Sequence, residues 1–245
     1  MAVDDANTIV LHHFNGPGAS VFTDESGKTW TPTLSAYIDT GEKKFGAASA
    51  HIVGAGGYVT TPNHADFNMG SGDFTIDFWI NFITLPTQSA SSYVPIISKY
   101  VDDNNFWALA VQRTFSSTYI SFGQKESSSW TIDTNKSSWT LAVGAWHHYA
   151  VIKASNVYKF SYDGTLYAAS SGSPDTTALN NFATTLRIGD TEGGSGTPAM
   201  EEIKAYIDEL RISNVARWAA NFTPSTSEYG PTTAVGFYPK VTMVL

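Results

Sequence analysis

The run from Asp73 to Phe82 places the strongest constraint on the fold, because apolar and polar residues alternate along it. Its apolar positions are Phe74, Ile76, Phe78, Ile80 and Phe82. Successive side chains of a strand point to opposite faces, so this pattern predicts a strand with one face in a core. Trp79 lies on the other face, which predicts that this second face is also covered by protein or binds a ligand.

The composition indicates a globular, strand-rich chain. Hydrophobic residues make up 42% of the 245 residues and charged residues only 15%, which allows a sizeable core. Aromatic residues reach 13%, and they favour pleated, half-buried surfaces. No internal repeat or linker divides the chain. We therefore expect one domain over residues 1–224 and a tail over 225–245 that adds a strand or docks on a neighbouring molecule.

The charge and the cysteine content exclude several kinds of partner. The net charge is -8, so the basic footprint of nucleic-acid binders is missing and we expect no nucleic-acid partner. There is no cysteine, which removes disulfides, thiolate metal sites and a cysteine nucleophile. No run approaches the roughly 20 apolar residues of a membrane span, so we expect no membrane insertion. The acidic start lacks the apolar core of a signal peptide.

A second predicted strand, from Ala205 to Ser213, carries an acid among apolar residues. Strict alternation places Tyr206, Asp208, Leu210 and Ile212 on one face. A carboxylate on a core-facing side needs a cation, a metal or several hydrogen-bond donors, because an unpaired buried charge is too costly. We therefore expect Asp208 to have a partner elsewhere in the chain.

The middle of the chain predicts four consecutive strands, at residues 96–99, 106–113, 119–122 and 129–133. Residues 84–93 are rich in Ser, Thr, Gln and Pro and predict a long loop before them. The cluster from Asp102 to Asn105 predicts a turn, because Asp and Asn bond to their own backbone. A calcium loop is the alternative for this cluster, although the spaced ligands of an EF-hand are missing.

Several short motifs follow one another in a recognisable order. They are Leu11-His12-His13-Phe14, Asp24-Glu25-Ser26-Gly27, Lys44-Phe45-Gly46, Gly72 to Trp79, Trp146 to Ala150, Tyr162-Asp163-Gly164 and Tyr206 to Ser213. Over about residues 9–224, this set resembles the laminin-G-like, concanavalin-A-like lectin/glucanase superfamily. The resemblance implies an all-β fold, a jelly-roll β-sandwich of two antiparallel sheets, one concave and one convex.

The catalytic motif of the glucanase branch is missing. That branch carries Glu-x-Asp-x-x-Glu on one strand, and this spacing does not occur here. Retaining hydrolysis needs two carboxyl groups about 5–5.5 Å apart. We therefore expect no enzymatic activity and keep a degenerate glycoside hydrolase as the remote alternative.

Some members of the superfamily hold a structural calcium ion. The resemblance places it at Asp208, with the backbone near Gly46 as a further contributor and Asp24 as a more speculative ligand. The alternative is that Asp208 pairs with Arg211, Arg217 or backbone amides.

Compact domains of this style resemble virion proteins of tailed phages. The resemblance implies a non-enzymatic virion structural protein, made in the host cytoplasm, that decorates a capsid or forms a tail appendage. Its partners would be other virion proteins, further copies of itself in a homo-oligomer, or host-surface glycans. The alternative is a carbohydrate-binding module of an extracellular or cell-surface protein.

Sugar sites use aromatic platforms with a few placed polar groups. The candidates in and beside the central strands are Tyr100, Asn105, Trp107, Arg113, Tyr119 and Trp130. For each aromatic residue among them, packing in the core is the alternative, because aromatic side chains dominate cores.

Overall fold

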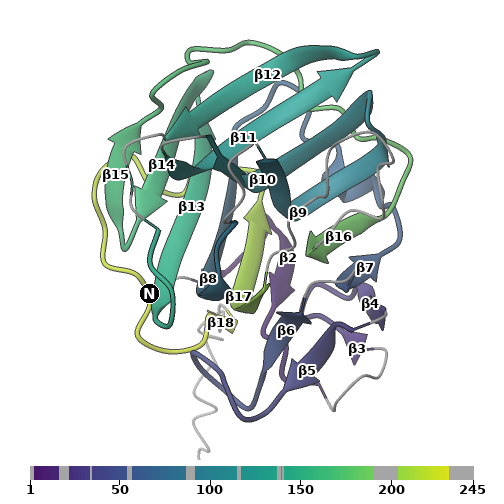
Figure 1. The fold of residues 1–245 in the computed structure, drawn as a ribbon, viewed down its shortest axis with the longest axis vertical. Coiled ribbons are helices and arrows are strands. Elements are labelled where there is room, and N and C mark those ends of the chain that lie inside the picture. The colour runs from purple at the N-terminus through teal and green to yellow at the C-terminus, as the bar shows by residue number, and fades with distance from the viewer. Residues whose placement is uncertain are drawn as a thin grey trace, which may run out of the picture.

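The computed structural model describes residues 3–16, 22–33, 35–53, 57–86, 92–114, 117–136, 139, 141–189 and 204–231. Two antiparallel sheets pack face to face in this part of the chain (Figure 1). The all-β sandwich predicted from the sequence is confirmed. The described residues include no helix long and apolar enough to cross a membrane.

The first sheet, called the β8 sheet, has its longest strand near the middle. Its order is β15 (Thr165–Ala168), β14 (Val157–Tyr162), β13 (Trp146–Ala154), β8 (Phe74–Thr84), β17 (Lys204–Ser213), β6 (Ser49–Val53) and β5 (Tyr37–Asp39). Strand β2 (Thr8–His12) also pairs with β17.

The second sheet, called the β10 sheet, contains the four strands predicted in the middle of the chain. Its order is β12 (Ser129–Lys136), β11 (Thr118–Glu126), β10 (Asn105–Arg113), β9 (Ser92–Asp102), β16 (Leu186–Gly189), β7 (Tyr58–Thr61), β4 (Thr29–Thr33) and β3 (Phe22–Thr23). A short parallel pair joins β1 (Val3–Asp4) to β18 (Gly230–Pro231), and η1 (Ala65–Phe67) is a single 3-10 turn.

The predicted loop at 84–93 is shorter in the structure. Strand β8 runs to Thr84 and β9 already begins at Ser92. The polar composition of this stretch hid the strand ends, because Ser and Thr are accepted in strands as well as in loops. The residues from 87 to 91 lie outside the described part of the chain.

The core lies between the two sheets and includes the inner face of β8. All five apolar side chains of the alternating run are at most 1% exposed. They pack against β10-sheet side chains; for example, the rings of Phe74 and Phe122 lie 5.5 Å apart. The alternation in the sequence therefore identified the central core strand correctly.

The outer face of β8 is covered by two segments from distant parts of the chain. The ammonium group of Lys44 lies 4.0 Å from the centre of the Trp79 ring, and Phe45 packs edge-on against the same ring. Farther along β8, the Thr75 hydroxyl donates to the carbonyl of Val215, at 2.8 Å, in the chain that follows β17. Of the two alternatives for this face, coverage by protein is thus confirmed.

Strand β17 contains a β-bulge, which changes the expected direction of its side chains. Asp208 and Arg211 lie opposite successive outward residues of β8, so β17 has one residue more than its neighbour at this point. Glu209, inside the bulge, has φ 52°. Leu210 and Ile212 point into the core, whereas the extra residue leaves Asp208 on the outer face. The prediction that Asp208 shares a face with Leu210 and Ile212 is wrong.

The packed chain continues beyond residue 224, where the sequence placed the end of the domain. Tyr229 is 1% exposed, and its backbone N–H donates to the Glu209 carboxylate at 2.7 Å. Strand β18 then pairs with β1. The first part of the predicted tail is thus docked on its own domain, while residues 232–245 lie outside the described part.

Candidate functional site

Four aromatic rings gather on the outer face of the β10 sheet. They belong to Tyr93 and Tyr100 of β9, Phe106 of β10 and Trp130 of β12, and we call them the aromatic platform. Phe106 lies 5.7 Å from Trp130, 5.9 Å from Tyr100 and 6.1 Å from Tyr93, measured between ring centres. Trp130 is 46% exposed, which is unusual for so large an apolar side chain. The platform therefore offers aromatic surface to solvent.

Small residues form the floor beneath these rings. They are Ser98, Ala108, Ala110, Ser121 and Gly123, all on the outer face of the sheet. A Cβ atom on Gly123 would lie 2.7 Å from Cζ3 of Trp130, so the indole lies across the bare backbone of this glycine. The small side chains leave room for the rings against the sheet, where Phe106 and Tyr93 are inclined to the Trp130 ring by 85° and 62°.

A β-bulge in β12 sets the direction of Trp130. Trp130 lies opposite Lys125 and Ile132 opposite Gln124, which leaves Thr131 as the extra residue. Ile132 is fully buried in the core. Strict alternation would place Trp130 in the core beside Ile132, and the bulge turns it outward.

The structure places three predicted aromatic residues on this face and one elsewhere. Tyr100 and Trp130 belong to the aromatic platform, and Tyr119 lies on the same face with 8% of its surface exposed. Trp107 has no exposed surface and packs in the core, 6.0 Å from the ring of Phe122. Trp107 is thereby removed from the candidate set.

Sequence reasoning missed two rings of the platform, Tyr93 and Phe106. Phe106 precedes Trp107 on β10, so the two rings point to opposite faces. The signal was present: Phe106 alternates with Ala108 and Ala110, small residues that leave room for a ring on their face. Tyr93 was hidden inside the predicted loop.

The other two candidates brace the loops that border the platform. Asn105 donates to the carboxylate of Asp102 at 3.0 Å and accepts the backbone N–H of Ser127 at 3.2 Å. Arg113 donates to the Pro86 carbonyl and to the Thr118 hydroxyl, both at 3.1 Å. These side chains hold the rim in place.

The predicted turn at residues 102–105 is confirmed. The Asp102 carboxylate accepts the backbone N–H of Asn104 at 2.8 Å, as Asp does in a turn. The neighbouring Asp103 carboxylate accepts the Tyr100 hydroxyl at 2.6 Å. Lys125 donates to the Asp103 carbonyl and lies 5.7 Å from the centre of the Trp130 ring. The platform thus has a polar border at this end.

Comparison with known proteins identifies the family. The model described as the concanavalin A-like lectin/glucanases superfamily, Laminin_G_3, matches residues 53–221. The chain belongs to this superfamily. A comparison with curated proteins gives no match.

Solved structures of low sequence identity share the fold. The binding domain of Paraclostridial mosquitocidal protein 1 has a TM-score of 0.62 at 13% identity, covering 86% of this chain and 49% of that one. Trypanosoma rangeli sialidase with 2,3-difluorosialic acid has a TM-score of 0.58 at 14% identity, covering 87% and 31%. The chain thus spans half or less of these two proteins.

A third similar structure has nearly the same extent as this chain. Domain 4 of AbnA, a GH43 extracellular arabinanase from Geobacillus stearothermophilus, was solved in complex with arabinotriose. Its TM-score is 0.59 at 17% identity, covering 87% of this chain and 95% of that domain. At this identity the likeness shows the concanavalin-A-like fold.

The superfamily's calcium position falls on Asp208, and backbone amides occupy it. One oxygen of the fully buried Asp208 carboxylate accepts the N–H groups of Lys44 and Phe45, at 2.9 and 3.0 Å. The other oxygen accepts the N–H of Glu209 at 2.9 Å. Burial raises the pKa of Asp208 to about 7, although these amides work in the opposite direction. Three of the roughly four acceptor positions of the carboxylate are thus used by donors.

Of the other two predicted calcium positions, Asp24 is engaged by protein donors and Gly46 lies against polar side chains. The Asp24 carboxylate accepts the indole N–H of Trp30 at 3.0 Å. Gly46, with φ 59°, lies against the side chains of Asn15 and Glu228, which fill the space that a Cβ would need. Calcium requires 6–8 oxygen ligands, and donors already face these carboxylates. The Asp208 and Asp24 carboxylates do not fit a calcium ion, and the geometry favours the alternative in which backbone amides are the partners of Asp208.

We therefore expect metal removal to leave the stability unchanged. Treatment with excess EDTA followed by dialysis should shift the melting temperature by less than about 1 °C, since each 1 kcal/mol would shift it by about 2–4 °C in a domain of this size. Differential scanning fluorimetry with and without added calcium measures this. A rise of several degrees on adding calcium would contradict the expectation.

The outer face of the β8 sheet holds a buried polar network around Asp77. Its carboxylate accepts two N–H groups of Arg211, at 3.0 and 2.9 Å, and the hydroxyl of Tyr229 at 2.9 Å. His148 Nε2 lies 3.4 Å from the same carboxylate. Burial alone would raise the pKa of Asp77, but Arg211 and then His148 bring it down to about 2. The partner of Arg211 is thus Asp77, whereas one alternative had paired it with Asp208.

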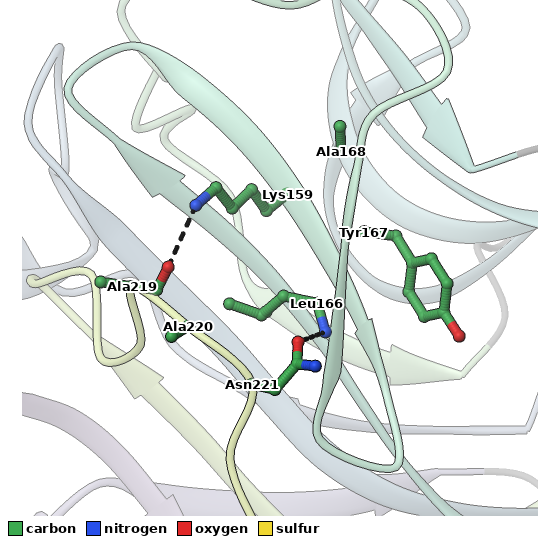
Figure 2. Close-up of a pocket in the computed structure, with 7 residues that line it drawn as sticks. All are labelled: Lys159, Leu166, Tyr167, Ala168, Ala219, Ala220 and Asn221. Atoms are coloured by element: carbon green, nitrogen blue, oxygen red, sulfur yellow. Dashed lines mark hydrogen bonds between the residues drawn. The ribbon is translucent and has the colours of Figure 1, made fainter.

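A groove at the edge of the β8 sheet lies beside strand β15 (Figure 2). Lys159 donates to the carbonyl of Ala219 at 3.2 Å, and the backbone N–H of Leu166 donates to the Asn221 side chain at 2.9 Å. These contacts fasten the chain after β17 to the edge of the sheet. The groove holds none of the predicted site residues. We interpret it as the packing boundary between the edge of the β8 sheet and the chain that follows β17.

Proposed function

We propose that this domain binds a glycan on the aromatic platform and does not cleave it. The observation that carries the proposal is the exposed Trp130 ring, held flat on Gly123 beside three further rings. The apolar face of a sugar ring stacks on such a surface, and polar groups at the border supply orientation. Small residues, among them Ala108, Ala110 and Gly123, lie beside the rings on the same face and leave room for a ligand above them.

Similar structures support the proposal without deciding it. The AbnA domain has the same fold over nearly its whole length and holds arabinotriose. The mosquitocidal protein's domain is called a binding domain. Because a domain of the same fold holds an oligosaccharide in another protein, glycan binding is the first activity to test here. The aromatic platform is the surface on which we expect it.

Substitution of Trp130 tests the proposal. We expect Trp130→Ala to weaken binding of the glycan by about thirtyfold, or about 2 kcal/mol, because Trp residues are typical binding hot spots. A glycan array selects the ligand, and isothermal titration calorimetry measures the dissociation constant. The melting temperature should change little, since much of the indole is already in solvent.

A matched control is Tyr37→Ala on the opposite sheet. Tyr37 is also an exposed aromatic residue, at 38%, but lies on edge strand β5. The Tyr37→Ala variant should bind the glycan with the same affinity as the unmodified protein. Equal glycan affinities of the Trp130→Ala variant and the unmodified protein would refute the platform as the site.

A separate measurement tests whether the bound glycan is cleaved. Mass spectrometry of the recovered oligosaccharide should show no cleavage product, and a product would overturn the non-enzymatic proposal.

We further propose that the domain acts in a virion, as a capsid decoration or a tail appendage. This rests on the resemblance in the sequence to compact phage domains. The glycan would then be on the host surface, and other virion proteins or further copies of this chain would hold the domain in place. A mass-spectrometric inventory of purified virions tests the setting, and absence of the chain from them would favour an extracellular carbohydrate-binding module.

A further inference from the structure

The bulge that turns Trp130 outward brings an acidic side chain to the same face. Trp130 lies opposite Lys125 and Asp133 opposite Gly123, and Lys125 and Gly123 are two residues apart on β11. Side chains two residues apart share a face, so Trp130 and Asp133 also do. In a regular strand, residues three apart would point to opposite faces. The bulge at Thr131 therefore creates the pair of an aromatic ring and a carboxylate.

The Asp133 carboxylate is exposed and available. Among the described residues no hydrogen-bond donor or cation contacts it. Its charge reaches the hydroxyl groups of the same face: burial, and with it the negative charge of Asp133, raises the pKa of Tyr119. The carboxylate thus lies on the same face as the aromatic platform and Tyr119, and no described residue pairs with it.

The surroundings of Asp133 are more acidic than basic. The border of the platform carries the carboxylates of Asp102, Asp103 and Glu126 and the ammonium group of Lys125, which donates to the Asp103 carbonyl. An anionic ligand on the platform would meet this negative charge. Two like charges about 4 Å apart in water repel by about 1 kcal/mol, or roughly a fivefold effect on affinity.

We propose that Asp133 orients a sugar stacked on the aromatic platform by accepting hydrogen bonds from two of its hydroxyl groups, and that the site takes neutral rather than anionic sugars. The inference rests on the proposed glycan function. Stacking fixes the plane of a sugar but tolerates rotation and sliding, because an aromatic ring has no directional acceptor. A carboxylate has two acceptor oxygens, and hydrogen bonds to it are about twice as strong as those between neutral groups.

The test compares neutral and acidic sugars on two variants. An array carries arabinotriose, lactose and other neutral oligosaccharides beside sialylated and uronic-acid counterparts, such as 3′-sialyllactose for lactose. The unmodified protein should bind a neutral member at least fivefold more tightly than its acidic counterpart. Asp133→Ala should weaken binding of the neutral sugar about tenfold or more. Asp133→Asn, which keeps one acceptor oxygen, should lose less affinity for the neutral sugar than Asp133→Ala does. It should also reduce the difference in affinity between neutral and acidic sugars.

The control removes one negative charge far from the platform. Glu25→Gln changes an exposed residue in the turn between β3 and β4, at the opposite end of the β10 sheet. It should leave both affinities unchanged. All three variants should keep the melting temperature of the unmodified protein, because neither Asp133 nor Glu25 is buried.

The outcomes separate this inference from the proposed function. Binding that depends on Trp130 but is unaffected by Asp133→Ala would overturn the role of Asp133 and leave the platform standing. Tighter binding of acidic sugars would overturn the neutral specificity. If no member of the array binds to the unmodified protein, the glycan function fails and the role of Asp133 fails with it.

Discussion

Arg211→Ala is expected to lower the free energy of unfolding by about 3–5 kcal/mol, because it leaves the buried Asp77 carboxylate without its cation. Arg211 and Asp77 each have at most 1% of their side chains exposed, and two N–H groups of one meet two oxygens of the other. Tyr229, whose hydroxyl also donates to this carboxylate, is an uncharged donor and does not replace the guanidinium. Urea denaturation followed by fluorescence measures the loss.

A double-mutant cycle and a surface control sharpen this result. The double variant Asp77→Ala/Arg211→Ala should lose clearly less free energy of unfolding than the sum of the losses of the two single variants. Each single change leaves one buried charge without its partner, and the double change removes both charges. Lys159→Ala, which removes a half-buried cation near the edge of the same sheet, should cost much less, at most about 1 kcal/mol. Additive losses in the cycle would show that Arg211 and Asp77 do not act as a pair.

Asp208→Ala is expected to cost about 3 kcal/mol or more. The change removes the acceptor of three backbone N–H groups, from Lys44, Phe45 and Glu209, in a site without solvent exposure. An unsatisfied buried donor costs about 1–3 kcal/mol, and partial relaxation of the loop recovers some of the sum. The loss appears as a lower urea midpoint with an unchanged slope.

Asp208→Asn is the matched variant for this prediction. Burial raises the pKa of Asp208 to about 7, so a neutral side chain is better tolerated here than at a carboxylate of ordinary pKa. Asn keeps one acceptor oxygen and should therefore lose less stability than Ala. A melting curve of Asp208→Ala that matches the unmodified protein would show that the loop at Lys44 and Phe45 does not depend on this carboxylate.

Strand alternation predicted the parts of the fold in which the strands are regular. The core-facing side chains from Phe74 to Phe82 were predicted correctly. Strand β8 pairs with β13 in regular register, so the period of two along β8 is preserved. The same rule failed at Asp208, and strict alternation would also have put Trp130 on the wrong face, because β17 and β12 each hold one extra residue. A bulge changes the face of every side chain beyond it.

Only part of the candidate site could be predicted from the sequence, because the face on which a side chain lies depends on strand pairing. Tyr100 and Trp130 were named as sugar-facing aromatics, and Trp107 was named with them although it points into the core. Within β10 alone, the small residues Ala108 and Ala110 on the face of Phe106 were the one indication of which ring faces outward. That choice depends on the strands paired with β10 and on the core that its other face must complete.

The sequence by itself determined a strand-rich chain, its central core strand and a buried acid in need of donors, because these follow from composition, local alternation and the cost of burying charge. The arrangement as a sandwich was implied by the resemblance to the superfamily. Only the tertiary structure decided which donors reach Asp208 and which rings form the platform. Both depend on bulges in β17 and β12. A bulge is fixed by pairing with a neighbouring strand, and one inserted residue exchanges the two faces, so its consequences lie beyond any reading of one strand alone.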